Sequence, residues 1–329
     1  MKSTMRTLTL LVSVLVLALS IGSAQDDLAA KLSQMGSDAA KGFTSPILSG
    51  WAADINSGFY HSADLHDVLG FDVGVKISLA RPSTDDKTYK FDMPATITYS
   101  GQTLTRGTHY ATTITANSAV GDKAATEVRT IAAGGTGGVI PANTLIMTLP
   151  GGFDLPAIPL PMPQVNVGLP LGLEVMARFV PTISAGDAGK FNMQGFGIRY
   201  DIDQWIPLFP IDIAAHFFTQ KMNFKDKNDK DVFSGSGTAY GVEISKKLFI
   251  LTVYGGFQLE KGKMELGSFT GKDPSTGAAV TVNGFTVDGA NTSRVTVGAR
   301  LLLLLINAHV EYSVAKNPVI TAGVGISIR

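Results

Sequence analysis

The end of the chain, GARLLLLLINAHVEYSVAKNPVITAGVGISIR (residues 298–329), contains five consecutive leucines followed by Ile306. A transmembrane helix needs about 20 apolar residues, but Arg300 and Asn307 bound this run on its two sides. Before and after the run, apolar and polar residues alternate one by one. A period of two is typical of strands with one apolar and one polar face. The run is therefore predicted to hold a tight turn between two strands, near residues 304–307.

The same alternation recurs along most of the chain. Strands are predicted at residues 51–61, 70–80, 88–99, 164–180, 190–201, 211–223, 238–246, 250–260, 279–287, 293–303, 306–315 and 319–328. In the clearest of them, every second residue from Val165 to Phe179 is apolar. Pro170 interrupts the polar register, and because proline removes a ladder donor, a bulge or local break is expected there.

Two observations favour lipid on the apolar face of these strands. Charged residues are only 16% of the chain, below the usual quarter for soluble domains. The opposite face carries ionisable side chains that would be costly in a dry core, namely Glu174, Arg178, Arg294, Arg300, His309 and Glu311. A soluble β-sandwich or a lipocalin-like barrel is the alternative, with its apolar face turned inward.

The predicted fold is therefore all-β, a transmembrane antiparallel β-barrel of about 12–14 strands with a short N-terminal helix. The six ionisable residues are lumen-lining candidates, with a role in hydration and electrostatic filtering and none in catalysis. Trp51, Trp205, Tyr254 and Tyr312 are candidates for the aromatic belts at the bilayer interfaces. The expected non-protein partner is outer-membrane lipid.

The N-terminus has the features of a cleaved secretory signal, at residues 1–24. Lys2 and Arg6 precede a short apolar core, and the small residues Gly22, Ser23 and Ala24 follow it. A membrane anchor helix is the alternative, but the apolar core is short. The signal predicts export of the chain from the cytoplasm.

The segment after the signal, residues 25–49, is predicted to be an amphipathic helix or plug. Leu28, Leu32 and Met35 recur at helical spacing. This helix would enter the pore, lie on the membrane, or pack at the mouth of the barrel, which spans residues 50–329.

A long loop insertion interrupts the predicted barrel at residues 101–163. It is rich in Thr, Ala and Gly and ends in a run of alternating prolines. Since short turns lie at the periplasmic end of such barrels and long loops outside, this insertion, 225–231 and 267–277 are predicted to be extracellular. Residues 205–210 and 246–249 are predicted to be periplasmic.

No motif in the sequence predicts chemistry. The chain has no cysteine, which excludes disulfides and thiolate metal sites. His309 and Ser313 share a strand face, but about 13 Å separates their Cα atoms at ~3.3 Å per residue, so they form no catalytic pair. The formal net charge is zero, with 27 basic and 27 acidic residues, which gives no reason to expect nucleic acid. We predict no enzyme activity, no cofactor and no metal.

Several stretches, taken in order, carry a resemblance to a known group of proteins. They are residues 56–63 (NSGFYHSA), 168–176 (GLPLGLEVM), 195–202 (GFGIRYDI), 204–207 (QWIP), 210–216 (PIDIAAH) and 251–256 (LTVYGG). Together they resemble an uncharacterised family of Gram-negative outer-membrane barrels, itself similar to the FadL-like transporters of long-chain fatty acids and other hydrophobic compounds. The resemblance covers residues 43–329, with 101–152 poorly matched.

The resemblance implies passive transport or uptake of small hydrophobic molecules by a monomer. A non-transporting surface barrel whose long extracellular loops bind partners is the alternative. The barrel-assembly machinery is an expected partner during biogenesis. Such barrels commonly end in an aromatic residue, and the end here, Ile326-Ser327-Ile328-Arg329, departs from that pattern.

Overall fold

The computed structural model describes residues 36–184, 189–206, 209–226, 229–272 and 279–328. The predicted signal peptide and the start of the predicted helix lie outside the described residues. Within them, no helix is both long enough and apolar enough to cross a membrane.

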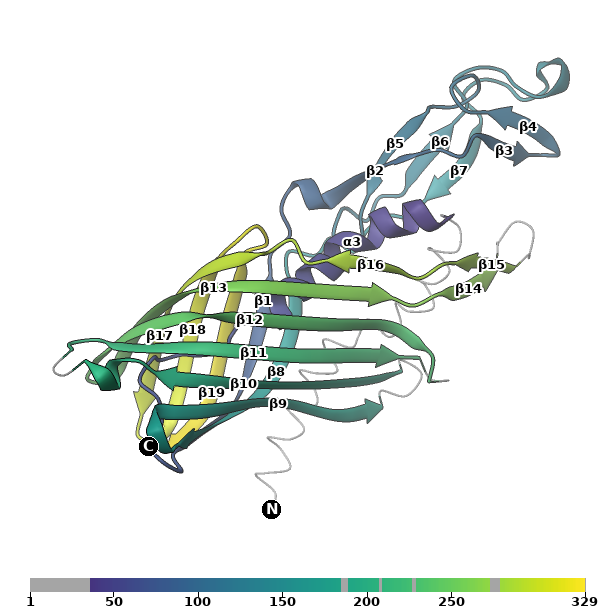
Figure 1. Cartoon of the computed structure of the whole chain (residues 1–329). Coiled ribbons are helices and arrows are strands. Elements are labelled where there is room, and N and C mark those ends of the chain that lie inside the picture. Colours follow the sequence, from purple (N-terminus) through teal and green to yellow (C-terminus); the bar gives the residue numbers. More distant parts are fainter. Residues whose placement is uncertain (1–35, 185–188, 207–208, 227–228, 273–278, 329) are drawn as a thin grey trace.

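Ten antiparallel strands form a closed barrel (Figure 1). They are β1 (Phe71–Ala80), β8 (Ile158–Leu169), β9 (Leu173–Ser184), β10 (Lys190–Asp201), β11 (Asp212–Lys225), β12 (Asp231–Leu248), β13 (Leu251–Leu266), β17 (Ser293–Leu303), β18 (Ile306–Val314) and β19 (Val319–Ile328). Each pairs with its neighbours in the chain, and β1 closes the circle by pairing with β19 from Phe71↔Ile328 to Ala80↔Val319. The predicted fold class is confirmed.

The barrel has fewer strands than the sequence predicted. Three predicted strands lie outside its wall: residues 51–61 are helix and interior segment, 88–99 belong to an outer lobe, and 279–287 form short strands beyond the mouth. Conversely, the single strand predicted at 164–180 is two, because Pro170 opens a turn in which Leu171 has φ +67° and Gly172 φ +68°. The strands β11, β12 and β13 reach 14, 18 and 16 residues, longer than the roughly 9–11 needed to cross a bilayer.

The leucine run contains the predicted turn. β17 ends at Leu303 and β18 begins at Ile306, and these two residues pair across the turn. Leu304, at φ +56°, is 97% exposed at its tip.

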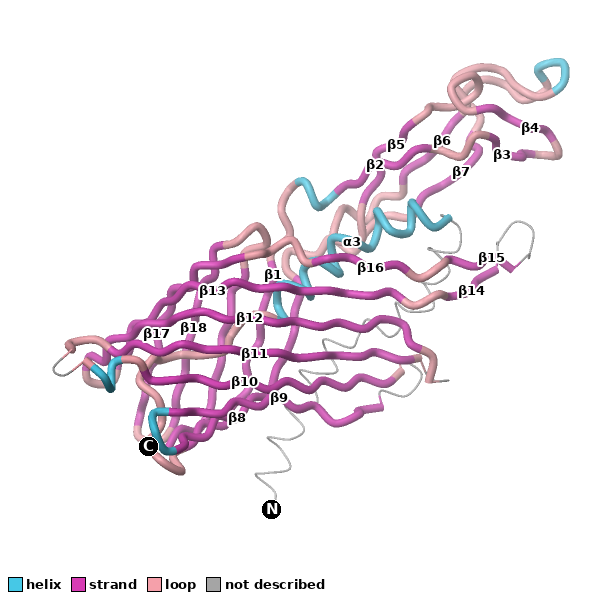
Figure 2. Tube along the Cα trace, in the orientation of Figure 1, coloured by secondary structure: helices cyan, strands magenta, loops and turns pink. Residues whose placement is uncertain are grey.

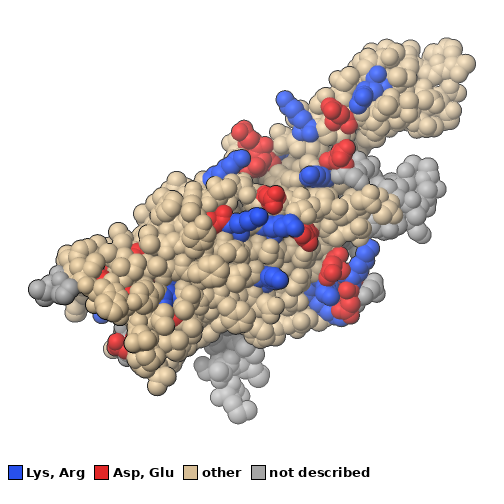
Figure 3. All heavy atoms as spheres, viewed as in Figure 1, with Lys and Arg blue, Asp and Glu red and all other residues tan. Residues whose placement is uncertain are grey.

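Side chains on the barrel wall alternate between an apolar outside and a polar inside. Along β18 the exposed residues are Ile306, Ala308, Val310, Tyr312 and Val314, and the buried residues are Asn307, His309, Glu311 and Ser313. An outer face of this kind is stable against acyl chains and not against water. In Figure 3 the wall carries wide uncharged areas, and the charged residues gather toward one end and at the base of the lobe. The chain is a membrane barrel.

The two ends of the barrel differ in the length of their connections. One end, here called the short-turn end, holds the β8–β9, β10–β11, β12–β13 and β17–β18 turns and the start of β1. The other, the long-loop end, holds the β13–β17 connection with β14 (Phe269–Lys272), β15 (Ala279–Val282) and β16 (Phe285–Asp288). The segments predicted to be periplasmic and extracellular separate in the same way.

A lobe of residues 81–157 stands on the long-loop end between β1 and β8 (Figure 2). Its short strands are β2 (Thr88–Asp92), β3 (Thr96–Tyr99), β4 (Gln102–Thr105), β5 (Thr113–Asn117), β6 (Thr126–Arg129) and β7 (Leu145–Leu149). The insertion thus begins earlier than the predicted residue 101. Residues 158–163 belong to the barrel wall, where β8 stays paired with β1 in continuous register through Pro159 and Pro161.

One helix, α3 (Gly36–Ile55), joins the lobe to the barrel. Its first half packs Ala39, Ala40 and Phe43 into the core of the lobe. Its second half packs Leu48 and other apolar residues inside the barrel mouth, against β8, β10, β11 and β13.

Trp51 belongs to this second half, and its assignment to an aromatic belt is wrong. The indole is 9% exposed and stacks on Phe233 inside the barrel, with ring centroids 4.8 Å apart. The alternation from Trp51 to His61 suggested a wall strand, but the chain here is inside the wall.

The alternation predicts that an arginine on the outer face of the wall costs much more unfolding free energy than an arginine on the surface of the lobe. Val310→Arg, at a wall residue that is 53% exposed, is expected to lower the free energy of unfolding by roughly 2–4 kcal/mol in lipid vesicles. Val139→Arg, at a lobe residue that is 65% exposed, is the matched control and should be nearly neutral. The measurement is a urea titration of each variant refolded into vesicles. Equal effects of the two substitutions would show that the outer face of β18 does not contact lipid.

Candidate functional site: a polar lumen and its plug

The lumen is occupied by the chain's own N-terminal part. After α3 ends at Ile55, residues 56–66, here called the plug segment, run through the barrel interior toward the short-turn end, and residues 56–63 are all buried. The segment is not a strand, so its backbone donors and acceptors have no ladder to satisfy them. Buried backbone groups need partners, and the side chains of the wall supply them.

Gly58 is bonded through its backbone to three wall strands, β1, β9 and β18. Its carbonyl accepts hydrogen bonds from Lys76 Nζ at 2.6 Å and Arg178 Nη2 at 2.9 Å, and its N–H donates to Glu311 Oε1 at 3.1 Å. Its φ is +67°, and a Cβ at this position would lie 3.0 Å from Thr321 Cγ2. Glycine is therefore required here by both conformation and space.

Other wall residues bind neighbouring plug carbonyls in the same manner. Arg178 also donates to the carbonyl of Ser57 at 2.7 Å, and its guanidinium lies 4.7 Å from the Phe59 ring centroid. Further bonds are Gln258 Nε2 to Asn56 O, Gln164 Nε2 to Phe59 O, Arg199 Nη2 to Ser62 O and Ala63 N to Ser245 Oγ. Just before the plug segment, Arg294 Nη2 donates to Ala53 O in the last turn of α3. The plug is thus bonded to strands on all sides of the lumen.

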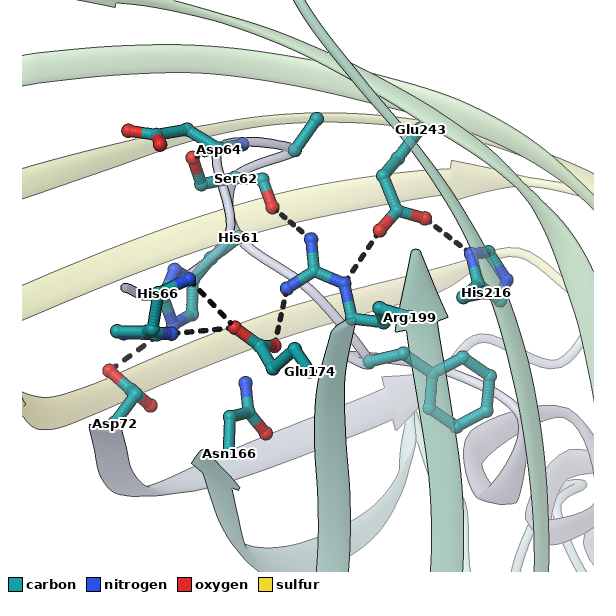
Figure 4. Close-up of polar contacts among 12 residues, drawn as sticks. His61, Ser62, Asp64, His66, Asp72, Asn166, Glu174, Arg199, His216 and Glu243 are labelled. Carbon is teal, nitrogen blue, oxygen red and sulfur yellow. Dashed lines mark hydrogen bonds and ion pairs between the residues drawn. The ribbon is translucent and has the colours of Figure 1, made fainter. Parts of the chain in front are cut away.

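A chain of ionic contacts runs along the inner face of the neighbouring strands β9 to β12 and reaches the plug segment at His66 (Figure 4). Arg199 on β10 is at its centre, 2.6 Å from Glu174 Oε1 through Nη1 and 2.7 Å from Glu243 Oε1 through Nε. The second oxygen of Glu243 bonds His216 Nδ1, and the second oxygen of Glu174 lies 2.6 Å from His66 Nδ1. We call these five residues the arginine ladder. All five are nearly fully buried, so each charge depends on its neighbours for compensation.

The structure places all six predicted lumen residues inside the barrel, with exposures from 0% to 7%. Glu174 belongs to the arginine ladder, Arg178 and Glu311 bind Gly58, and Arg294 forms a bidentate pair with Glu260 at 2.6 and 2.7 Å. Arg300 and His309 meet around His61, whose ring centroid is 4.8 Å from that of His309. Glu174, Arg178, Arg300 and Glu311 each bond the plug segment, and His309 contacts it through the ring of His61. Their roles in hydration and filtering stay predictions.

Tyr254 is not at the membrane interface, and its belt assignment is wrong. It is 5% exposed and donates its hydroxyl to Glu311 Oε2 at 3.1 Å in the lumen. Trp205 is 71% exposed beside the β10–β11 turn, in the short helix Asp203–Trp205, and donates to Tyr200 Oη at 2.7 Å. Tyr312 is 40% exposed on the outer face of β18. For Trp205 and Tyr312 the belt role stays a prediction.

Several site residues were missed by the sequence analysis. Lys76, Arg199 and Glu243 occupy inward positions of β1, β10 and β12, so the same alternation could have found them. His66 could not have been found in this way, because it lies in the plug segment, which has no repeating pattern. Among the described residues, no group of three or more His, Asp or Glu side chains is arranged to hold a metal ion.

The comparison with protein families now adds one result. A family model matches residues 1–328, and its description is "Family of unknown function (DUF6588)". The chain belongs to this family. No curated protein matches. The predicted membership of an uncharacterised barrel family agrees with this result, while the likeness to FadL-like transporters stays an expectation.

Solved structures similar to the chain include several membrane barrels. The translocator domain of the autotransporter NalP from Neisseria meningitidis is 10% identical, with 80% of this chain and 90% of that chain covered and a TM-score of 0.31. The β domain of the Bordetella autotransporter BrkA is 10% identical, with 79% and 100% covered and a TM-score of 0.32. Ail of Yersinia pestis is 16% identical, with 47% and 95% covered and a TM-score of 0.24. At TM-scores this low, the function of none of these proteins transfers to this one.

The arginine ladder makes a prediction about stability. Arg199→Gln leaves the carboxylates of Glu174 and Glu243 buried without their cation, so the free energy of unfolding should fall by roughly 3–5 kcal/mol. Lys263→Gln is the control, since this residue pairs with Glu265 at an exposed site where its side chain is 43% accessible, and such pairs are worth about 1 kcal/mol or less. Both variants would be unfolded in vesicles and followed by tryptophan fluorescence. A loss for Arg199→Gln no larger than the control's would mean that the ladder does not stabilise the fold.

Proposed function

We propose that this chain is an outer-membrane barrel that is closed to passive diffusion and presents its lobe at the cell surface for binding to a partner. The observation that carries the proposal is the plug segment, which runs through the lumen and is bonded to the wall by charged and polar side chains from nine of the ten barrel strands. Opening a pore would require the simultaneous loss of these bonds, each worth about 1–3 kcal/mol where a charged group takes part.

The lobe has the features of a rigid, displayed module. It has its own core, formed by Met93, Leu104, Tyr110, Val128 and Leu149 among others. Ile131 and Val139, which are 59% and 65% exposed, lie near its tip. On the face drawn in Figure 3, the charged residues of the lobe lie toward the barrel and the far tip of the lobe shows none. A partner would therefore be held by apolar contacts and hydrogen bonds more than by charge.

Orientation follows from the lengths of the connections. Barrels of the outer membrane place short turns in the periplasm and long loops outside, which supports a location of the lobe on the cell surface. The surrounding outer-membrane lipid and the barrel-assembly machinery remain the partners that this location implies.

Uptake of small hydrophobic molecules is the second candidate function. The apolar cluster around Phe59, Phe218 and Tyr254 in the middle of the lumen favours it, but the cluster lies between layers of charged residues. A hydrophobic solute passing through would displace the plug and expose those charges to an apolar surface. The closed surface barrel is therefore the better supported candidate.

A flux measurement separates the two candidates. Purified full-length protein in vesicles should give the same swelling rate with small sugars, and the same uptake of a hydrophobic dye, as protein-free vesicles. Gly58→Val, which clashes with Thr321 and loses the left-handed conformation, should loosen the plug and raise the swelling rate above that background. Wild-type flux clearly above the empty-vesicle rate would overturn the closed-barrel proposal and support transport.

Surface display is tested by epitope insertion. Gly137 lies at the tip of the lobe, where an added side chain would meet no other residue within 4 Å apart from its chain neighbours. A tag inserted there should be bound by antibody on intact cells. A tag at Phe249, 90% exposed in the β12–β13 turn, is the control and should be bound only after the outer membrane is permeabilised. The reverse pattern would place the lobe in the periplasm and exclude a surface partner.

A further inference from the structure

Three side chains that are far apart in the sequence meet at the short-turn end of the lumen. Ser327 is on β19, Glu174 is on β9, and His66 is the last residue of the plug segment. His66 Nε2 lies 3.1 Å from Ser327 Oγ, and His66 Nδ1 lies 2.6 Å from Glu174 Oε2. The backbone N–H of His66 donates to the same carboxylate oxygen at 3.2 Å. Glu174 therefore holds both the backbone and the imidazole of His66.

We propose that Ser327, His66 and Glu174 form a serine-hydrolase site that acts on carboxylic esters bearing an acyl chain. A nucleophile bonded to a base, itself oriented by a third group, is the arrangement that activates a serine hydroxyl, and it is recognised by geometry and not by sequence order. The site is independent of the proposed surface function, since it faces the opposite end of the barrel.

The hydrogen bonds set the role of each group. The Glu174 carboxylate accepts a hydrogen bond from His66 Nδ1–H. Nε2 then carries the lone pair, which accepts a hydrogen bond from the Ser327 hydroxyl. Arg199 binds the other oxygen of Glu174 and keeps the carboxylate charged and in place. Ser327 and His66 are the catalytic residues, and Glu174 is a positioning residue.

The reaction balances without a cofactor. Ser327 Oγ attacks the ester carbonyl carbon while its proton passes to His66 Nε2, and the same proton then leaves with the departing alkoxide as an alcohol. Water attacks the acyl-serine in the second half, gives one proton to His66 and releases the carboxylic acid, with the proton returning to Ser327. Ester and water are consumed, and acid and alcohol are produced.

The surroundings of Ser327 indicate the acyl chain. The turn that follows His66 exposes Val68 and Leu69, which are 57% and 77% accessible. Leu305, 51% exposed, accepts the backbone N–H of Ser327 at 2.8 Å. Apolar side chains are thus exposed at the same end of the barrel as Ser327, close to the edge of the bilayer. Ser327 itself is only 3% exposed, so substrate enters when the exposed turn at residues 67–69 moves aside.

Covalent labelling tests the proposal directly. Full-length protein in vesicles, treated with an alkyl fluorophosphonate, should become labelled at Ser327 as located by peptide mass, and should hydrolyse p-nitrophenyl esters. Ser327→Ala should abolish both, and His66→Gln should slow labelling about 100-fold or more. Glu174→Gln should slow labelling and also shift its pH profile, which a purely structural role would not do.

Ser313 supplies the matched control. It is an equally buried serine on the lumen wall, bonded to Thr296 Oγ1 at 2.8 Å in place of a histidine, so Ser313→Ala should leave labelling unchanged. Folding of each variant is checked by heat-modifiable migration on gels. Absence of label on folded wild-type protein, or label elsewhere than Ser327, overturns the proposal.

A single-cysteine pair tests activation in a different way. The chain has no cysteine, so Ser327→Cys and Ser313→Cys each introduce the sole thiol. Beside an imidazole a thiol ionises more readily, and Ser327→Cys should therefore react with iodoacetamide near pH 6.5 at least tenfold faster than Ser313→Cys. Equal rates would show that His66 does not activate the position or that the turn does not open, and either result overturns the proposal.

Discussion

The fold depends on hydrogen bonds between charged wall side chains and the backbone of a segment that has no secondary structure. A membrane barrel exposes its apolar side chains to lipid, so its polar side chains point inward. In a wide barrel, water would satisfy them. Here the barrel has ten strands and little room, and an unpaired buried charge costs several kcal/mol. The bare carbonyls and N–H groups of the plug segment supply the missing partners, and the wall side chains satisfy the plug in return.

This mutual dependence divides the interior into layers with different physical roles. Near the long-loop end, the second half of α3 fills the barrel with apolar contacts, including the stacked Trp51 and Phe233. Around Gly58 and below it, hydrogen bonds to Arg178, Lys76 and Arg199 are added to the packing of Phe59 against Phe218. Apolar layers tolerate small displacements, whereas a buried ionic network has few alternative arrangements. The polar layer is therefore the part that fixes the path of the chain through the lumen.

The strands of the wall could be predicted from the sequence, whereas the plug segment could not. Alternation identified most strands, the leucine turn and the inward direction of Glu174, Arg178 and Glu311, because a strand has a fixed period. The number of strands came out too high because residues 88–99 and 279–287 alternate as wall strands do while pairing elsewhere. Trp51 was misplaced because a few residues of helix can mimic period two. Ser327, His66 and Glu174 could not be associated at all, since only closure of the barrel and the path of the plug bring them together.

The position of α3 joins the two ends of the molecule into one mechanical unit. Phe43 is held in the core of the lobe and Ile55 in the core of the barrel, and the plug segment continues directly from Ile55 to His66. The helix is continuous from Gly36 to Ile55, with Pro46 inside it, so it provides one covalent path from the lobe to the plug that does not pass through the wall. The wall is held by a closed ladder of backbone hydrogen bonds between strands. The plug has no such ladder and is held by hydrogen bonds from the side chains of the wall. A load on the lobe would therefore reach Gly58 along α3 as well as through the wall strands β1 and β8, to which the lobe is joined directly.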